Sequence, residues 1–431
     1  MVFLGLVCGC GSDDNGLIST EPDMDPELAN MPPSSGLLGV ADNAVHVSQT
    51  PTLEWETSTD PDGDAVVYDI LLDRDTDPST TIGQDLTGTT FTVENPLFLE
   101  TEYHWKVMAM DDKGNEVQSD GIFSFTTRNL NYPNVVVQQN PFTNRHQHTS
   151  LVFDNKLWIF GGTDNTIRFN DIWWSENGAD WTKEVNSKLL YPKKRLHSSV
   201  VFDDRMWIIG GYGDDGQSND VWSSEDGMVW EEATPNANFT PRNSHASVVF
   251  DNKLWVIGGY DGTYRSDVWY SQDGINWTQA TSDGGFAPRG MHAAVVMDGK
   301  IWVIGGNNTD GILDDVYYSV DGTIWVFYSS GTDVEGFPAV TSFPLLYGHT
   351  ALAYGGKLWV IAGHTEGVGL DGYSNDVWYN DGTDPNWKEL EPGPLTFPSR
   401  AGHTSLVFGH AVWILGGMND NGVFNSVWNL D

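Results

Sequence analysis

The stretch 242–281 decides the fold, because it contains four short segments that recur along the chain. They read RNSHASVVF (242–250), LWVIGG (254–259), SDVWYS (266–271) and WTQAT (277–281). The diglycine that ends the second segment, or its near equivalent, occurs six times: Gly161-Gly162, Gly210-Gly211, Gly258-Gly259, Gly305-Gly306, Ala362-Gly363 and Gly416-Gly417. The intervals are 49, 48, 47, 57 and 54 residues. A repeat of this length with four strand-like segments predicts a radial array of four-stranded blades.

The turn between the third and fourth segments also repeats. In the stretch above it contains Asp273-Gly274, and related pairs occupy the same place elsewhere: Asn177-Gly178, Asp226-Gly227, Asp321-Gly322 and Asp381-Gly382. Two-residue hairpin loops favour such pairs, because both central residues take a positive φ. We therefore predict that a two-residue hairpin joins the last two strands of each blade.

Large aromatic residues stand at fixed places in the third and fourth segments. They are Trp173, Trp222, Trp269, Tyr317, Trp378 and Trp428, followed by Trp181, Trp230, Trp277, Trp325 and Trp387. Side chains of this size can fill the space between neighbouring blades, so we predict that they pack there.

Together these features resemble the kelch repeat, whose signature is a diglycine after the second strand and a later pair of an aromatic residue and Trp. The resemblance covers residues 132–431 and implies a six-bladed kelch β-propeller. The fifth copy departs from the pattern with Ala362, and the sixth ends at Asp431 after its third strand. We expect residues 134–139 (NVVVQQ) to supply the missing fourth strand, which would leave no open sheet edge.

The segment 34–127 has short alternating strands and no diglycine, which predicts a small β-sandwich. The placement of Trp55, Tyr68, Tyr103 and Trp105 resembles a fibronectin type III domain. The loop 60–64 (DPDGD) has the look of a calcium loop, but it lacks the following Gly and the distal Glu of an EF-hand. We interpret this loop as a solvated turn.

Both cysteines, Cys8 and Cys10, lie at the N-terminus. The apolar run MVFLGLVCG before Cys10 resembles the lipobox of a bacterial lipoprotein, with residues 1–10 as a signal remnant and Cys10 as the lipidated residue. The run is short and lacks a basic start, so a disordered N-terminus is the alternative. Residues 11–33 read as a disordered tether. The acidic run after Cys10 resembles the surface-export tag of Bacteroidetes lipoproteins, so we expect a secreted protein anchored to the outer membrane or cell surface, with the periplasm as alternative.

The charge balance narrows the classes of partner. The chain has 60 acidic and 21 basic residues, a net charge of −39. Such a charge repels nucleic acid phosphates and anionic lipid heads, so we expect no nucleic acid and membrane contact only through a lipid anchor. We also expect a monomer without a cofactor.

The resemblance to kelch proteins implies a ligand face, built from the loop after each diglycine and the loop that leads into each innermost strand. The first set is Thr163, Tyr212, Tyr260, Asn307, His364 and Met418, and the second is His146, Leu196, Asn243, Gly290, Gly348 and Ala401. Eight of these positions are the candidate ligand-binding residues: Tyr212, Tyr260, Asn307, His364, Asn243, His146, Thr163 and Met418. Aromatic and amide side chains suit stacking on a sugar or anchoring a protein, and the sequence leaves both ligands open.

Two further residue series repeat around the predicted ring. Arginine precedes the innermost strand at Arg145, Arg242, Arg289 and Arg400, with Lys194 or Arg195 in the second copy and Leu346 in the fifth. These cations could clamp a carboxylate or sulfate, but we favour pairing with a neighbouring blade. Histidine recurs three residues later, at His148, His197, His245, His292, His349 and His403. We favour a hydrogen-bonding role over a metal site, because opposing inner strands are too far apart to share one ion.

No catalytic constellation is evident. Galactose oxidase shares the kelch ring, but its copper site needs a cysteine that residues 132–431 lack. A mutarotase acting on sialic acid needs a carboxylate and basic groups at the channel mouth, and candidate acids are Asp164, Asp214, Glu335 and Glu366. No spacing pairs these acids. We therefore predict a cell-surface or periplasmic binding lipoprotein that recognises a glycan or protein, with a sialic-acid mutarotase or a structural adhesion protein as alternatives.

Overall fold

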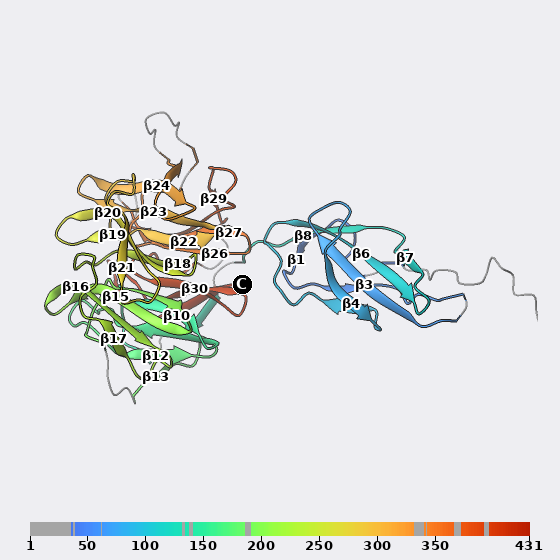
Figure 1. Ribbon diagram of the computed structural model, residues 1–431, viewed down its shortest axis with the longest axis horizontal. Coiled ribbons are helices and arrows are strands. Elements are labelled where there is room, and N and C mark those ends of the chain that lie inside the picture. Colours follow the sequence, from blue (N-terminus) through green and yellow to red (C-terminus); the bar gives the residue numbers. More distant parts are fainter. Residues whose placement is uncertain are drawn as a thin grey trace, which may run out of the picture. The chain divides into compact units, whose positions relative to one another are not determined.

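The computed structural model describes residues 36–37, 39–61, 63–131, 134–137, 141–185, 191–331, 340–341, 343–365, 372–391 and 396–431. All regular elements of these residues are β-strands, and no helix there could span a membrane. The chain divides into two compact units (Figure 1), the first within Met1–Asn95 and Thr101–Thr127, the second within Pro96–Glu100 and Arg128–Asp431. Cys8, Cys10 and the predicted tether lie outside the described residues.

The first unit consists of two sheets. The larger has the order β1 (Ala44–Val47), β8 (Phe123–Thr127), β6 (Glu102–Asp111), β3 (Val66–Asp73) and β4 (Thr81–Leu86), with β7 (Glu116–Gln118) paired to β6. The smaller pairs β2 (Thr52–Glu54) with β5 (Thr90–Thr92). Alternate residues of β3 are buried, including Tyr68, whose ring lies 5.5 Å from that of Trp55. Trp105 on β6 is fully buried, so large aromatic residues form the core of this unit.

The second unit contains six four-stranded sheets among the described residues, numbered here in chain order. Sheet 1 contains β10 (Thr149–Phe153), β11 (Lys156–Phe160), β12 (Ile172–Ser175) and β13 (Thr182–Lys183). Sheet 2 contains β14 (Ser198–Phe202), β15 (Arg205–Gly213), β16 (Gly216–Ser224) and β17 (Glu231–Thr234). Sheet 3 contains β18 (Ala246–Phe250), β19 (Lys253–Tyr260), β20 (Tyr264–Ser271) and β21 (Trp277–Thr281). Sheet 4 contains β22 (Ala293–Met297), β23 (Lys300–Asn308), β24 (Gly311–Ser319) and β25 (Val326–Ser329). Sheet 5 contains β26 (Thr350–Tyr354), β27 (Lys357–His364), β28 (Tyr373–Asn380) and β29 (Lys388–Glu389).

Sheet 6 joins the two ends of this unit. It has the order β30 (Thr404–Phe408), β31 (Ala411–Leu415), β34 (Val427–Leu430) and β9 (Asn134–Val137), and a small pair, β32 (Met418–Asn419) and β33 (Gly422–Val423), precedes β34. The pairing predicted for residues 134–139 is therefore confirmed for the part that the structure describes. The first strands contact one another in a cycle, since β10, β14, β18, β22, β26 and β30 each touch the next and β30 touches β10.

The two-residue hairpins occur at a different junction from the predicted one. Residue pairs with positive φ connect the first and second strands, as Asp251 (48°) and Asn252 (52°) do between β18 and β19. The connection from β20 to β21 instead spans residues 272–276, and of these only Gly274 has a positive φ. There the Oγ of Ser271 accepts a hydrogen bond from the amide of Gly274 at 2.9 Å. The prediction of a two-residue loop at this place was wrong, because side chains rather than backbone conformation close the turn.

The diglycines connect neighbouring sheets. Gly258 and Gly259 have φ values of 58° and 104°, and the amide of Gly259 donates a hydrogen bond of 2.9 Å to the carbonyl of Arg289 in the next sheet. A Cβ on Gly259 would lie 2.8 Å from the Cβ of His245. Glycine is needed here for both conformation and space. In sheet 5 Ala362 adopts the left-handed conformation at 53°, so the first position tolerates a methyl group.

The core of the second unit lies between its sheets. Six apolar clusters each combine residues of two adjacent sheets, such as Trp173 and Trp181 of sheet 1 with Leu406 and Trp413 of sheet 6. All eleven aromatic residues of the predicted series belong to these clusters or pack against them. The prediction that they fill the space between blades is confirmed.

Candidate ligand-binding face

The loops after the diglycines and the loops into the innermost strands pair with each other, as expected for one common face. Isolated bridges join His146 to Thr163, Asn243 to Tyr260, Gly290 to Asn307 and Ala401 to Met418. In sheets 2 and 5 the bridges join Arg195 to Tyr212 and Tyr347 to His364. Leu196 and Gly348 were therefore predicted one residue too late, because Lys194 and Leu346 occupy the place that arginine has elsewhere.

The repeated arginines are all buried, and three of the four pair with an aspartate. Arg242 donates hydrogen bonds to both carboxylate oxygens of Asp267, at 2.7 and 2.9 Å, and to the carbonyl of Gly258 at 2.9 Å. The same arrangement pairs Arg145 with Asp171, Arg289 with Asp315 and Lys194 with Asp220. These partners lie in the same sheet, not in a neighbouring blade as predicted. These paired cations hold the loop in place and are not free to clamp a ligand. Arg400 differs, since it donates to the carbonyl of Gly416 at 2.6 Å and to the Oγ of Ser426 at 3.4 Å and forms no ion pair among the described residues.

A ring of backbone hydrogen bonds closes the centre of this face. Its members have φ values between 52° and 62°: Gln147, Leu196, Ser244, Met291, Gly348 and Gly402. The amide of each donates to the carbonyl of the one before, and the amide of Gln147 donates to Gly402, at distances of 2.7 to 3.0 Å. The ring residues and the six histidines together line a cavity of about 120 Å³.

The histidine series links neighbouring sheets. The Nε2 of His245 forms a hydrogen bond of 2.9 Å with the hydroxyl of Ser198 in the preceding sheet. The same bond joins His197 to Thr149, His403 to Thr350 and His148 to Thr404. Burial lowers the pKa of these imidazoles, to about 3 for His245 and about 4 for His349. They are therefore neutral at physiological pH. The described part of the chain contains no group of three or more His, Cys, Asp or Glu able to hold a metal ion.

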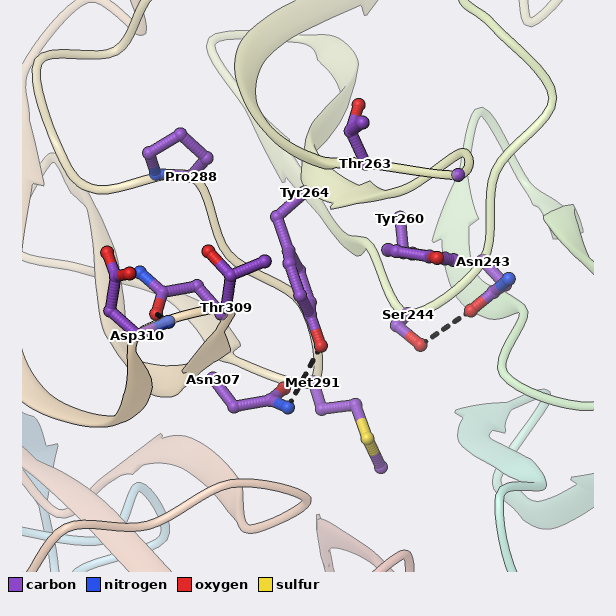
Figure 2. A pocket seen from close by; sticks show the side chains of 12 residues that line it. Asn243, Ser244, Tyr260, Thr263, Tyr264, Pro288, Met291, Asn307, Thr309 and Asp310 are labelled. Carbon is purple, nitrogen blue, oxygen red and sulfur yellow. Dashed lines mark hydrogen bonds between the residues drawn. The ribbon is translucent and has the colours of Figure 1, made fainter.

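A pocket of about 650 Å³ lies where sheets 3 and 4 meet on this face (Figure 2). It brings together the predicted residues Asn243, Tyr260 and Asn307, and adds Tyr264 and Met291, which sequence reasoning missed. Tyr264 could have been found from the strand register, since it pairs with Tyr260 across the β19–β20 hairpin.

Hydrogen bonds hold the pocket side chains in position. The Nδ2 of Asn307 donates to the hydroxyl of Tyr264 at 3.1 Å, and the two tyrosine rings pack edge to face at 5.1 Å. The Oδ1 of Asn307 is buried without a hydrogen-bond partner among the described residues. Asn243 accepts a hydrogen bond from Ser244 at 2.7 Å (Figure 2). The pocket thus combines aromatic rings with amide side chains.

The other predicted positions lie apart from this pocket. His146 and Thr163 are buried, and their side chains bond within sheet 1, to Asn165 and to the carbonyl of Ile167. His364 packs between the rings of Tyr347 and Tyr373, each at 4.7 Å. Tyr212 lies beside two arginines in sheets 1 and 2, and Met418 is partly buried in sheet 6.

Comparison with known proteins agrees with this architecture. Residues 109–306 and 273–431 match the KLHDC2/KLHL20/DRC7 Kelch-repeats domain. The chain belongs to the kelch-repeat family. No curated protein matches the sequence. Because kelch repeats commonly mediate protein binding, membership is consistent with a binding role.

The acids predicted as catalytic candidates form no pair on the kelch face as far as the structure describes it. Asp164 accepts hydrogen bonds from Thr166 and Ile167 of its own loop, and Asp214 is bound to Arg168. Glu335 and Glu366 lie outside the described residues. On this face the described residues of the kelch repeats present aromatic, amide and cationic groups.

Proposed function

We propose that this chain is a binding protein whose six-bladed kelch propeller recognises a glycan in the pocket between sheets 3 and 4. The observation that carries the proposal is the pocket itself, in which the rings of Tyr260 and Tyr264, packed edge to face at 5.1 Å, lie with the amide side chains of Asn243 and Asn307.

The composition of the pocket suits a sugar. The C–H face of a pyranose packs on an aromatic ring, while its hydroxyls need amide and hydroxyl partners such as Asn243 and Asn308. The volume of about 650 Å³ is within the usual range for small-ligand sites.

A protein ligand is the second candidate, supported by membership of the kelch family. Tyrosine, methionine and asparagine side chains also line protein interfaces, where tyrosine anchors the contact. The same face would then receive a loop or chain end of the partner.

The remainder of the proposal concerns the whole chain. Cys10 would carry a lipid, residues 11–33 would serve as a tether and residues 34–127 as a fibronectin type III-like spacer, so that a monomeric propeller faces the medium outside the cell. Mutarotation of sialic acid remains the enzymatic alternative. Its test is the rate of anomer exchange in sialic acid, followed by NMR with and without the protein.

A glycan array probed with the whole protein tests the proposal directly. The matched comparison is Tyr260→Ala/Asn307→Ala, with Thr278→Ala on the exposed strand β21 as a control outside the face. Binding by the parent and the control, but not by the double variant, would support the glycan site. A blank array, or binding that the double variant retains, would contradict it and favour capture of a protein from the cell envelope as the next experiment.

A further inference from the structure

Two arginines flank one tyrosine on the ligand-binding face. The guanidinium carbons of Arg168 and Arg195 each lie 5.6 Å from the centre of the Tyr212 ring. Arg168 comes from sheet 1, whereas Tyr212 and Arg195 belong to sheet 2, where they pair in an isolated bridge. The cluster therefore lies at the junction of two sheets on the same face as the pocket of Tyr260.

The repeats show that the framework does not require these two arginines. The residues equivalent to Arg195 in the other sheets are His146, Asn243, Gly290, Tyr347 and Ala401, and those equivalent to Arg168 are Gln217, Tyr264, Ile312, Tyr373 and Val423. The structural cation of sheet 2 is Lys194, which binds both carboxylate oxygens of Asp220. Arg195 is thus an additional cation beside a framework that is already complete.

The charge of Arg195 is not neutralised within the described residues. It forms no ion pair there; one Nη donates to the Oε1 of Gln147 at 3.0 Å, and its buried Nε has no hydrogen-bond partner. Arg168 is held by Asp214, whose side chain is 71 % exposed. Two neighbouring guanidinium groups repel each other, so an anion placed beside both would be bound favourably.

We infer that Arg195, Arg168 and Tyr212 form a subsite for a carboxylate of the ligand. A planar guanidinium binds a carboxylate through two parallel hydrogen bonds, and the tyrosine ring supports both cations from the side. The overall negative charge repels polyanions, so the subsite takes a ligand with isolated carboxylates, such as a uronic acid within a glycan. This inference deepens the proposed function and rests on it only for the identity of the ligand.

The test uses two pairs of probes that differ in charge but hardly in shape. A trisaccharide with one galacturonic acid residue is compared with its methyl ester, and a capped Ala-Glu-Ala peptide with its Gln counterpart, by calorimetric titration of the whole protein. We expect the saccharide acid to bind roughly tenfold tighter than its methyl ester. The saccharide pair would assign the carboxylate to a glycan, and the peptide pair would assign it to a protein partner.

Variants separate the subsite from the pocket. Arg195→Gln should abolish the preference for the acid, whereas Arg265→Gln, which alters another partly exposed arginine paired with Asp261, should leave it unchanged. Tyr260→Ala should weaken the acid and the ester equally. Equal affinity for acid and neutral probe in the parent, a preference that survives Arg195→Gln, or no binding of any probe would overturn the inference. If Tyr260→Ala weakens the binding of both probes but the acid still binds more tightly than the ester, the pocket and the subsite are both supported.

Discussion

The amide of Gly417 donates a hydrogen bond of 2.9 Å to the carbonyl of Arg145, although the two residues lie near opposite ends of the kelch region. Each diglycine makes the same bond to the following sheet, so this one completes the set. Together with the pairing of β9 and β34, it connects sheet 6 to sheet 1. Closure of the kelch unit therefore depends on contacts between residues that are distant in sequence.

Gly417→Ala should destabilise this closure by about 2–3 kcal/mol, because the residue has a φ of 97° and a Cβ would lie 2.8 Å from the Cβ of His403. Thermal unfolding of both proteins measures the effect. Gly422→Ala is the matched control, since its φ is 136° but nothing lies within 4 Å of a Cβ. An equal loss in the two variants would mean that strain, not the contact with His403, sets the cost.

Ala293→Ser should stabilise the protein by about 0.5–1.5 kcal/mol, because a hydroxyl at this place bonds the histidine of the next sheet elsewhere in the ring. Ser198 makes this bond to His245 of the next sheet. Ala293 occupies the equivalent place before His349, and the Nε2 of His349 has no hydrogen-bond partner among the described residues. Urea unfolding checks the prediction. Thr350→Val, which removes the hydroxyl bound to His403, should have the opposite sign; an unchanged or lower midpoint in Ala293→Ser would contradict the assignment.

Asp267→Asn should cost about 3 kcal/mol, because it leaves the buried guanidinium of Arg242 without its carboxylate. The comparison is Asp251→Asn, which breaks an exposed pair with Lys253 and should change stability by well under 1 kcal/mol. Chemical denaturation of both variants provides the measurement. Similar small losses in both would show that the buried Arg242 does not need the charge of Asp267.

Stability should fall below pH 4. Partial burial raises the pKa of Asp273, but hydrogen bonds from Asn276 and Ile275 outweigh this effect and lower it to about 2. Asp321 has a pKa of about 2 for the same reason, with bonds from Ile324 and Thr323. A carboxyl with a lower pKa in the folded state adds stability above its ordinary pKa of 3.8, and this contribution disappears as the pH falls towards 2.

The double variant Asp273→Asn/Asp321→Asn tests this pH dependence. It should be less stable than the parent at pH 6, and the difference should shrink between pH 4 and pH 2. Unfolding midpoints across this range give the comparison. A difference that stays constant with pH would exclude these two turns as its source.

Much of the kelch unit could be predicted from the sequence, because its strongest signals depend on local geometry. Each diglycine has positive φ values and lies close to a neighbouring strand, so a side chain at a position such as Gly259 would be strained. The glycines therefore recur visibly in the sequence. The aromatic series and the strand at Asn134–Val137 followed from the same repeat. The register failed in sheet 2, where Lys194 rather than Arg195 marks the place, and in sheet 5, where the residue directly after Leu346 is Tyr347 and not Gly348.

The candidate site was predicted only in part. Tyr260, Asn307 and Asn243 converge as expected, but Tyr264 required knowledge of the hairpin register, and the isolation of Arg195 required knowledge of which basic residue binds Asp220. The backbone ring had no sequence signal, since residues as different as Gln147, Leu196 and Gly348 adopt the same conformation in it.

The ring has a consequence for how this protein can diversify. The amides and carbonyls of the ring bond to one another, so this hub of the face leaves few backbone groups free for a ligand. Its hydrogen bonds involve no side chain, so they do not depend on which residues form the ring. Under the proposed function, recognition then depends on side chains, and each sheet contributes its own. Substitution of one of these side chains leaves the hub intact, and a new specificity can arise one sheet at a time without rebuilding the scaffold.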